Sequence, residues 1–406
     1  MQQINQSHPK QILPYLLASI LERASFYGLQ SGIVIYMISK TISMSQTEAI
    51  TVFSWYLSSL IVFQIIGGML GDFILGNKKA IIIGGIIQAI GAFSLLISSK
   101  TGLYLGLSLF TLGNGLYIPN LKANFGKLYL ESTKLLDAGF SIFYLSSNIG
   151  AIISSLLIIN IGTAYDYNYE FVLVGFMILL SLIPIFLSKD IELKEELNKF
   201  TLNLNQRIVN ILIIVFAVGL FWMFYSISDV RFFDIQTEFM KIKSLSHFSV
   251  LWNSSNSIFI LLISIFIIVL WTKFYTTQLH KLIIGFVFGL ISYGLLLYIP
   301  EVPNEHNVVL YFISLFMLAI GEVYISPIVN SIIIKYGKPK YFAILISLAY
   351  IPSKMLYLVF GLFKRDDFRT EPLLAIKIGF IATGIICFIL ITYYIIKNTN
   401  KSKLND

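Results

Sequence analysis

Residues 188–206, SKDIELKEELNKFTLNLNQ, form the most polar stretch between apolar blocks and lie near the middle of the 406-residue chain. Six apolar blocks precede this stretch and six follow it. Each block has about twenty residues, the length of helix that crosses the hydrocarbon core of a bilayer. We interpret the stretch as a solvated linker with no role beyond joining two sets of helices. The expected domains are therefore residues 1–188, a cytoplasmic linker at 189–206, residues 207–397, and a cytoplasmic tail at 398–406.

The composition also indicates a membrane protein. Hydrophobic residues make up 57% of the chain and charged residues only 12%, and the mean hydropathy is +0.81. Soluble domains carry about 25% charged residues. A chain this poor in charge cannot cover a surface that faces water. We expect an all-α, multi-pass integral membrane protein with about 12 transmembrane helices.

Charge in the connectors predicts how the chain is oriented. One alternating set of connectors and tails carries 18 Lys and Arg, whereas the other set carries 8. An excess of basic residues marks the cytoplasmic side. We therefore expect both termini in the cytoplasm and, by default, a location in the plasma (inner) membrane. The expected spans are 11–39, 46–71, 78–98, 102–123, 137–160, 169–188, 207–229, 248–272, 281–299, 307–335, 341–362 and 373–396.

Several binding functions are excluded by the pattern of residues. The formal net charge is +8, but the basic residues are scattered over connectors and form no stripe with aromatic residues, so no nucleic acid is expected. The only cysteine, Cys387, lies in an apolar segment, which excludes a disulfide or a thiolate metal site. The four histidines are not spaced as metal ligands, and they are His8, His247, His280 and His306. We expect no metal and no cofactor.

Four charged residues lie within the expected spans: Glu22, Arg23, Glu322 and Lys354. An ionisable group in hydrocarbon costs several kcal/mol, so it is usually paired or functional. One interpretation is a set of structural ion pairs that clamp helices together. The other is a charged cavity that binds substrate or protons. At 1.5 Å per residue, Glu322 and Lys354 both fall near mid-membrane, which makes a pair between them geometrically plausible.

Other charged or helix-breaking residues have simpler explanations. Lys377 and Asp72 lie near span ends, where side chains can reach the interface. Asp229 and Arg231 lie where the seventh span leaves the membrane, so their roles stay open. Bends are expected at Pro14, Pro119, Pro327 and Pro352. The pairs Gly67-Gly68 and Gly84-Gly85, together with Gly113 and Gly115, are expected to permit close contact between helices.

Short motifs recur along the spans in a characteristic order. They are ERASFYG at 22–28, GGMLGD at 67–72 followed by LGNK at 75–78, GNG at 113–115 with Pro119-Asn120, FYLSSNIG at 143–150, Phe221-Trp222, SSN at 254–256, and Gly321-Glu322 with Ser326-Pro327, Lys335 and Pro339. Each motif is weak alone, since small and polar residues are common where helices meet. Their order over most of the chain resembles the proton-dependent oligopeptide transporter family, a branch of the major facilitator superfamily.

The resemblance implies a major facilitator fold of two six-helix halves and proton-coupled uptake of di- and tripeptides by alternating access. It implies that a short peptide, protons and the bilayer are the partners of the protein. Arg23 would face the substrate carboxylate and Glu322 its amino end, while Glu22 and Glu322 would take part in proton coupling. The other residues expected in the substrate cavity are Tyr27, Asn148, Asn256 and Ser326. The loop expected to govern conformational change contains Gly68, Asp72, Gly76 and Lys78.

The chain departs from the family pattern at several positions. Ser19 replaces the first Glu of the family's ExxER motif, and Ile118 replaces the Lys of its fourth span. The remaining departures are Gln30 for Arg, Ser226 for Glu and Ser257 for Pro. The lost Glu and Lys positions are the ones that the family is thought to use for proton coupling.

Two residues, Lys354 and Asp229, could compensate for the lost groups. Tyr350 occupies the place of a cavity-facing tryptophan of the family. Lys354 lies one helical turn further along, on the same face, and could serve as the partner of Glu322. Asp229, three residues beyond Ser226, could restore the lost carboxylate of the seventh span.

Intramembrane enzymes and channels have sequence signatures that differ from those of carriers. We find no nucleophile–base pair of an intramembrane enzyme and no pore-lining ring of a channel, so we expect neither. Proton-coupled peptide uptake is the preferred function. The alternatives are an uncoupled or differently coupled carrier of another small polar solute, and a non-transporting receptor or scaffold.

Overall fold

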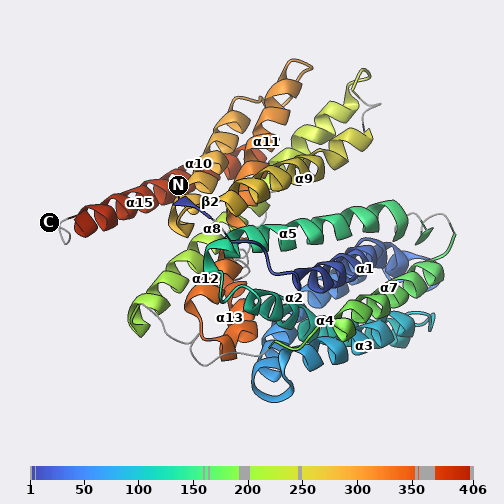
Figure 1. The fold of residues 1–406 in the computed structure, drawn as a ribbon. Coiled ribbons are helices and arrows are strands. Elements are labelled where there is room, and N and C mark those ends of the chain that lie inside the picture. Colours follow the sequence, from blue (N-terminus) through green and yellow to red (C-terminus); the bar gives the residue numbers. More distant parts are fainter. Residues whose placement is uncertain are drawn as a thin grey trace. The chain divides into compact units, whose positions relative to one another are not determined.

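The structure is a computed structural model in which nearly every ordered segment is helical (Figure 1). It describes residues 2–4, 6–158, 161–162, 165–191, 202–245, 249–352, 355 and 371–402. Within these residues, eight helices are long and apolar enough to cross a membrane. The expectation of an all-α, multi-pass membrane protein is therefore confirmed.

The helices belong to two compact units. One unit comprises residues 6–207 and 333–349, and the other comprises residues 1–5, 208–332 and 350–406. We call them the Arg23 unit and the Glu322 unit. The Arg23 unit includes residues 333–349, which are far from the rest of it in sequence. The domain division expected from the sequence stays a prediction.

Among the described residues, six helices of the Arg23 unit come from the first half of the chain. Helix α1 packs against α5 and α7, and α4 packs against α2 and α3, while α3 also contacts α7 (Figure 1). Helix α13, Phe342–Ala349, comes from the second half and packs against α2 and α4. The bounds of the six are α1 Ile12–Ile38, α2 Gln46–Leu70, α3 Asn77–Ser94, α4 Lys100–Lys127, α5 Leu136–Ile153 and α7 Tyr167–Leu187.

Glycine lets α3 and α4 approach closely, as the sequence predicted. A Cβ atom on Gly113 would lie 2.4 Å from the backbone nitrogen of Gln88 and 2.5 Å from the carbonyl oxygen of Gly84. Gly67 of α2 and Gly115 of α4 meet in the same way, because a Cβ on Gly67 would lie 2.2 Å from the Gly115 oxygen. Side chains at these positions would force the backbones apart.

The Glu322 unit is built around a pair of helices, α10 and α11. Helix α10 packs against α11 and α15, and α11 packs against α9. A two-stranded antiparallel sheet pairs β1, Gln2–Gln3, with β2, Phe274–Tyr275. The helices of the unit are α8 Leu204–Lys241, α9 Ser249–Lys273, α10 Gln278–Leu297, α11 Asn307–Ile325, α12 Ile328–Tyr336 and α15 Pro372–Ser402, of which α8 begins and α12 ends across the boundary with the Arg23 unit.

Some spans differ from the expected bounds. Helix α8 has 38 residues and is about 57 Å long, too long for a bilayer alone. The seventh helix therefore continues past the end expected at residue 229. The tenth span is divided at Ser326-Pro327 into α11 and α12, because proline cannot donate the hydrogen bond that would continue the helix. Pro119, in contrast, lies inside the continuous helix α4.

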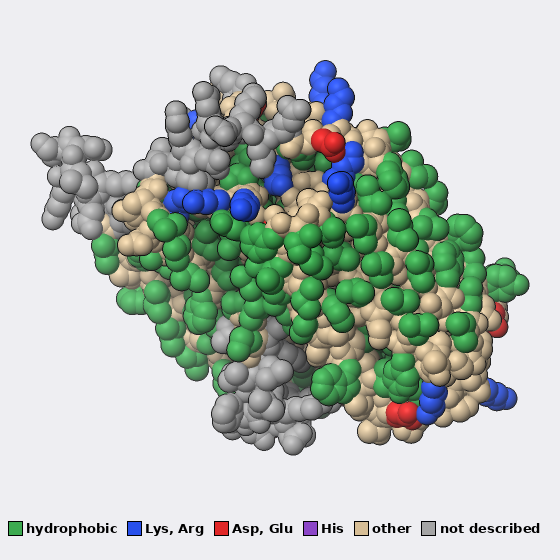
Figure 2. All heavy atoms as spheres, turned by 90° about the horizontal axis from the view of Figure 1, so that it is seen from below, with side chains coloured by type: hydrophobic (Ala, Val, Ile, Leu, Met, Phe, Trp, Pro, Cys, Tyr) green, Lys and Arg blue, Asp and Glu red, His purple; other side chains and the backbone are tan. Residues whose placement is uncertain are grey.

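The surface of the protein is strongly apolar. Large hydrophobic side chains such as Trp55, Phe216 and Phe388 are exposed. Green hydrophobic side chains cover much of the described part of the face in Figure 2, and few charged side chains interrupt them. A surface of this kind suits contact with lipid, since apolar groups gain nothing from contact with water.

Candidate functional site

A buried polar cluster lies at the centre of the Arg23 unit, around Glu22 of α1. Glu22 is fully buried. Its carboxylate accepts hydrogen bonds from Arg23 Nε at 2.6 Å and from Arg23 Nη2 at 2.9 Å. Gln88 Nε2 of α3 donates to it at 3.0 Å, and Asn114 Nδ2 of α4 at 2.9 Å. Gln64 of α2 extends the cluster by donating to Asn114 Oδ1 at 3.3 Å.

This arrangement joins α1, α3 and α4 through one carboxylate, and α2 is attached through Asn114. A buried charge is tolerated only where it is paired and hydrogen-bonded, and Glu22 meets both conditions. Removing one partner of such a pair leaves the other charge uncompensated, at a cost of about 3–5 kcal/mol. The geometry of Glu22 is that of the structural ion pair considered as one interpretation of the sequence.

Arg23 differs from Glu22 because it is not fully enclosed. Its side chain is 14% exposed. The guanidinium carbon lies 4.5 Å from the centre of the Phe26 ring and 5.8 Å from that of Tyr27. The hydrogen bonds to Glu22 use Nε and Nη2, so Nη1 takes no part in them. The two aromatic rings follow at three and four residues on the same helical face and hold the guanidinium in place.

Helix α5 contacts α1 next to Arg23. A Cβ on Gly150 would lie 2.6 Å from the carbonyl oxygen of Ile20 and 2.8 Å from Arg23 Cβ, so the two helices touch at backbone distance. The Ser147 hydroxyl lies 3.3 Å from that of Ser19. Asn148 is partly buried, and its Nδ2 donates to the Tyr144 carbonyl of its own helix at 2.9 Å.

The loop between α2 and α3 forms the second polar cluster of this unit. It contains a π-helical turn, η1, at Gly71–Leu75. Asp72 accepts hydrogen bonds from Asn77 Nδ2 at 2.9 Å and from the backbone nitrogen of Ile344 at 2.9 Å. Its carboxylate therefore caps the N-terminus of α13, where the helix dipole favours negative charge. The sequence suggested only that the Asp72 side chain reaches the interface. The structure adds this contact with α13.

The neighbours of Asp72 complete this cluster. Lys78 Nζ donates to the Ser188 carbonyl at 2.7 Å and lies 3.1 Å from Asp190. Gly76 has φ of +79°, a conformation that glycine adopts without strain. A Cβ on Gly68 would lie 2.9 Å from the Ala343 carbonyl, so α2 and α13 meet closely there.

The Glu322 unit holds the expected carboxylates. Glu322 of α11 is buried, and the exposed Asp229 of α8 is close enough for the two charges to interact. Asn256 Nδ2 of α9 donates to the Tyr225 hydroxyl at 3.0 Å. Tyr225 lies one helical turn before Asp229, so both point to the same side of α8.

Two further expected residues lie in the Glu322 unit. The Ser326 hydroxyl donates to the backbone carbonyl of Glu322 at 2.8 Å, where α11 ends. Asn330 Nδ2 donates to the Tyr350 hydroxyl at 3.4 Å. Lys354 lies outside the described residues, so the Glu322–Lys354 pair stays a prediction.

Arg231 has a structural role that the sequence left open. Its side chain is buried and forms an ion pair with Asp234. Its Nη2 donates to the carbonyls of Ile299 and Pro300, both at 2.9 Å. These carbonyls follow the C-terminus of α10, where a positive charge is favoured.

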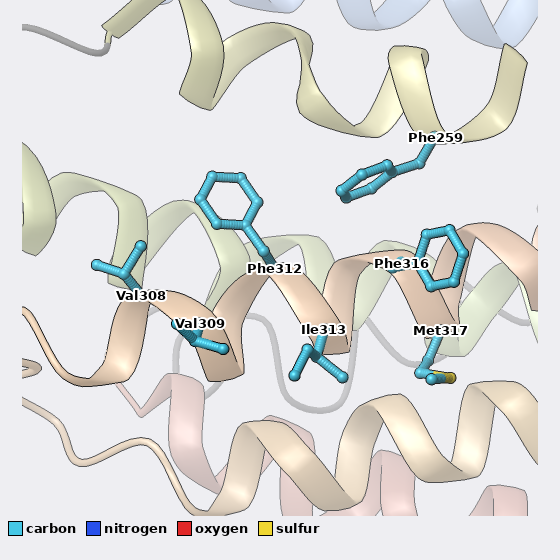
Figure 3. Close-up of a pocket in the computed structure, with 7 residues that line it drawn as sticks. All are labelled: Phe259, Val308, Val309, Phe312, Ile313, Phe316 and Met317. Atoms are coloured by element: carbon cyan, nitrogen blue, oxygen red, sulfur yellow. The ribbon is translucent and has the colours of Figure 1, made fainter. Parts of the chain in front are cut away.

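An apolar pocket of about 580 Å³ lies in the Glu322 unit, between α9 and α11. Figure 3 shows Phe259 of α9 facing Phe312 and Phe316 of α11. The remaining lining residues are Val308, Val309, Ile313 and Met317. The lining offers no group that could bind a charged solute, so this pocket is separate from the candidate site. No group of side chains suited to a metal ion occurs among the described residues.

Sequence reasoning missed Gln64 and Gln88, and it did not assign a role to Asn114. The available signal was a glutamine within an otherwise apolar span, since an amide in hydrocarbon also requires a partner. Only the packing of α2, α3 and α4 shows that Gln88 and Asn114 meet Glu22 and that Gln64 meets Asn114.

Comparison with curated proteins finds partial similarity. The dipeptide and tripeptide permease A of Proteus mirabilis is 37% identical over 173 residues, which cover 41% of this chain and 35% of that protein. The dipeptide and tripeptide permease B of Aliivibrio fischeri is 28% identical over 185 residues, 45% of this chain and 37% of that protein. The chain thus matches little more than a third of the length of these relatives.

Solved structures show the same fold over nearly the whole chain. A peptide transporter POT in complex with sulfate aligns with a TM-score of 0.66 and 19% identity, covering 96% of this chain and 95% of that one. A POT family transporter in complex with 5-aminolevulinic acid aligns with a TM-score of 0.62 and 22% identity, covering 95% and 97%. The major facilitator fold expected from the sequence is confirmed. Because the family model of the Major Facilitator Superfamily also matches residues 15–351, this chain belongs to the Major Facilitator Superfamily.

Proposed function

We propose that this protein is a secondary active transporter that takes up di- and tripeptides together with protons by alternating access. The distribution of charge supports the proposal most directly. The Arg23 unit has a partly exposed guanidinium, and the Glu322 unit has two carboxylates, Asp229 and Glu322, whose charges interact. Membrane proteins retain such groups mainly where they bind substrate or ions.

A short peptide matches these charges. Its carboxylate would bind to the guanidinium of Arg23, because arginine recognises carboxylates through charge-assisted hydrogen bonds. Its amino group would bind at Glu322. Tyr27, Asn148, Asn256, Ser326 and Tyr350 are the proposed uncharged contacts. The names of the curated relatives, dipeptide and tripeptide permeases, support this class of substrate.

Asp229 and Glu322 are the proposed proton-coupling groups. Two interacting carboxylates repel each other when both are ionised, and their titrations are coupled. A proton or the amino group of a substrate would relieve the repulsion. Glu22 is the weaker candidate for this role, because four hydrogen bonds already satisfy its carboxylate.

Uptake into proteoliposomes tests the proposal. Vesicles with the purified full chain should accumulate a labelled dipeptide when the outside is made acidic, and a protonophore should abolish the accumulation. Glu322→Gln should remove most of the gradient-driven uptake. Uptake no greater than in protein-free vesicles would contradict the proposal.

The departures at Ser19 and Ile118 favour a second candidate, an uncoupled carrier of another small polar solute. Ser19 is buried and bonded to Ser147, and Ile118 is also buried. Neither position offers a titratable group. This function predicts exchange of labelled solute that does not respond to a pH gradient. A thermal-shift screen of peptides, amino acids and nucleosides would identify the solute, since a ligand of the native state raises its stability.

The orientation and location of the chain belong to the same proposal. We propose that both termini face the cytoplasm and that the protein resides in the plasma (inner) membrane. The excess of Lys and Arg in one set of connectors supports this orientation.

A further inference from the structure

Glu170, in the first turn of α7, has a buried carboxyl group. Only 1% of its surface is exposed, and neither carboxyl oxygen has a partner among the described residues. Glu22, the other buried glutamate among the described residues of this unit, has an arginine and two amides as donors. The two glutamates therefore occupy opposite kinds of environment within one helical unit.

The carboxyl group of Glu170 fits into a slot between two glycines. A Cβ on Gly32 of α1 would lie 2.3 Å from Oε1, and a Cβ on Gly162 would lie 1.8 Å from Oε2. Any larger residue at either position would occupy the space of the carboxyl group. Helix α1 thus closes one side of the slot, and Gly162 closes the other.

Among the described residues, the groups around the slot provide no cation. The titratable neighbours are phenols: Tyr167, three residues before Glu170 on α7, and Tyr36 of α1, whose ring packs against that of Tyr167. Asp166, the N-cap of α7, is exposed and acidic. The lysines of α3, which also packs against α7, lie at its opposite end, where Lys78 binds Ser188.

An ionised carboxylate in this environment would lack both a partner and water. The cost of burying such a charge far exceeds the favourable effect of the α7 dipole. The group therefore holds a proton while the slot is closed. It can ionise only when α1 or the segment at residues 161–162 moves away and admits water. Connecting segments open at lower free energy than packed helices do.

We propose that Glu170 is a proton-binding site, which takes up a proton as the slot closes and releases it as the slot opens. The site lies at the end of the Arg23 unit opposite the Asp72 loop, since α7 begins at the slot and ends next to Lys78. It gives this unit a titratable group where Ser19 and Ile118 provide none. Its use in transport rests on the proposed function, but proton binding itself does not.

Infrared difference spectroscopy of the purified full chain tests proton binding directly. On raising the pH, wild-type protein should lose the carbonyl band of a protonated carboxyl group. Glu170→Gln should remove the part of this band that comes from Glu170, because the amide cannot titrate, and any part from Asp229 and Glu322 should remain. Glu48→Gln is the matched control, since Glu48 is a partly exposed glutamate paired with Lys100 at 2.9 Å, and it should leave the band unchanged.

Hydrogen exchange tests the coupling to opening. After correction for intrinsic rates, protection of the first turns of α7 should fall about ten-fold as wild-type Glu170 ionises, a typical coupling strength. In Glu170→Gln the protection should be independent of pH. Since glutamine is as neutral as the protonated acid, this variant should fold. If it does not fold, Glu170→Asp allows the same test through a shifted band.

The outcomes separate this inference from the proposed function. A difference band of unchanged intensity in Glu170→Gln, or exchange with the same pH dependence as wild type, would refute the proton site. If the band is lost as expected but wild-type vesicles transport no peptide, the proton site stands and the proposed function fails. If wild-type vesicles accumulate peptide, Glu170→Gln should lower gradient-driven accumulation about ten-fold and leave exchange at equal pH intact.

Discussion

At the scale of single residues, the two buried glutamates of the Arg23 unit show how environment divides identical side chains into different roles. Glu22 receives four hydrogen bonds from three residues. Glu170 receives none among the described residues. A satisfied buried charge stabilises the position of helices, whereas an unsatisfied acid exchanges its proton when its surroundings change. Position in a span alone would have assigned both residues to the same class.

Glu22→Gln should destabilise the protein because Arg23 would lose its only charged partner among these contacts. The expected loss is about 3 kcal/mol, the lower end for breaking a buried ion pair. Thermal unfolding of the purified protein in detergent measures it. The double variant Glu22→Gln with Arg23→Gln should recover part of the loss, since it removes the unpaired charge. Equal stability of Glu22→Gln and wild type would contradict the clamp.

His8 should make stability depend on pH. Burial lowers the pKa of His8 from its ordinary value of 6.5, because the charged ring loses hydration. Around that pH the unfolded chain binds more protons than the folded chain, so stability rises with pH. The contribution is complete above 6.5 and is lost as the pH falls through the lower folded value.

The expected size of the His8 effect is about 0.5 kcal/mol, because the ring is only partly buried. His8 also bonds the Tyr129 hydroxyl at 2.9 Å. Thermal unfolding at neutral and mildly acidic pH should show a smaller change with pH in His8→Asn than in wild type. His306→Asn, at an exposed position, is the control and should behave like wild type. The same change in all three proteins would sink this assignment.

How far the sequence predicts the site depends on whether a contact is local. Glu22 and Arg23 are neighbours in the chain, and their pairing was one of the two interpretations of the sequence. The contacts with Gln88 and Asn114 join residues 66 and 92 positions away from Glu22. No periodicity within one helix encodes them, because they depend on the rotation of α3 and α4 about their axes.

At the scale of helices, the surroundings of a glycine show whether its helix packs closely against another helix at that point. Gly113 faces the backbone of α3, whereas Gly384 of α15 faces only the Leu290 side chain at 3.6 Å, an ordinary contact. The sequence predicted close contact at Gly113 because small residues recur where membrane helices meet. It could not assign partners, since a glycine at a contact and one facing lipid look alike in a single sequence.

Alanine at these two positions should change stability in opposite directions. Gly113→Ala places a Cβ 2.4 Å from the backbone of Gln88 and should cost about 1–3 kcal/mol through overpacking. Gly384→Ala meets no such obstacle and should stabilise α15 by about 0.5–1 kcal/mol, since alanine favours helix over glycine. Thermal unfolding of both variants measures the difference. A stabilised Gly113→Ala would show that α3 and α4 are less closely packed than described.

The tenth span is divided into two helices, α11 and α12. Pro327 predicted a bend, and the structure shows a break between α11 and α12. The length of α8 was not predicted, because hydropathy marks where a helix leaves the hydrocarbon and not where it ends. Polar residues such as Gln236 and Glu238 continue the helix beyond the apolar block.

At the scale of the whole molecule, hydropathy and motif order were enough to predict the fold class. The family model matches residues 15–351, and solved transporters align over 96% of the chain at only 19% identity. Alternating access requires two halves that move relative to each other. Residues 333–349 come from the second half of the chain but group with the Arg23 unit. This grouping affects how the halves can move, because it connects part of the second half to the Asp72 loop. Separation in sequence gave no sign of that grouping.

The orientation of the molecule can be tested through its single cysteine. Cys387 is buried, so a membrane-impermeant maleimide should leave the wild-type protein unlabelled in intact cells. The excess of Lys and Arg predicts that the connectors containing Lys40 and Lys100 face outward. Lys40→Cys should therefore be labelled in intact cells, whereas Lys79→Cys should be labelled only after the cells are opened. Both positions carry a lysine in the wild type, so the two variants are matched in the residue removed. Labelling of Lys79→Cys alone in intact cells would reverse the topology and place the slot around Glu170 on the cytoplasmic side.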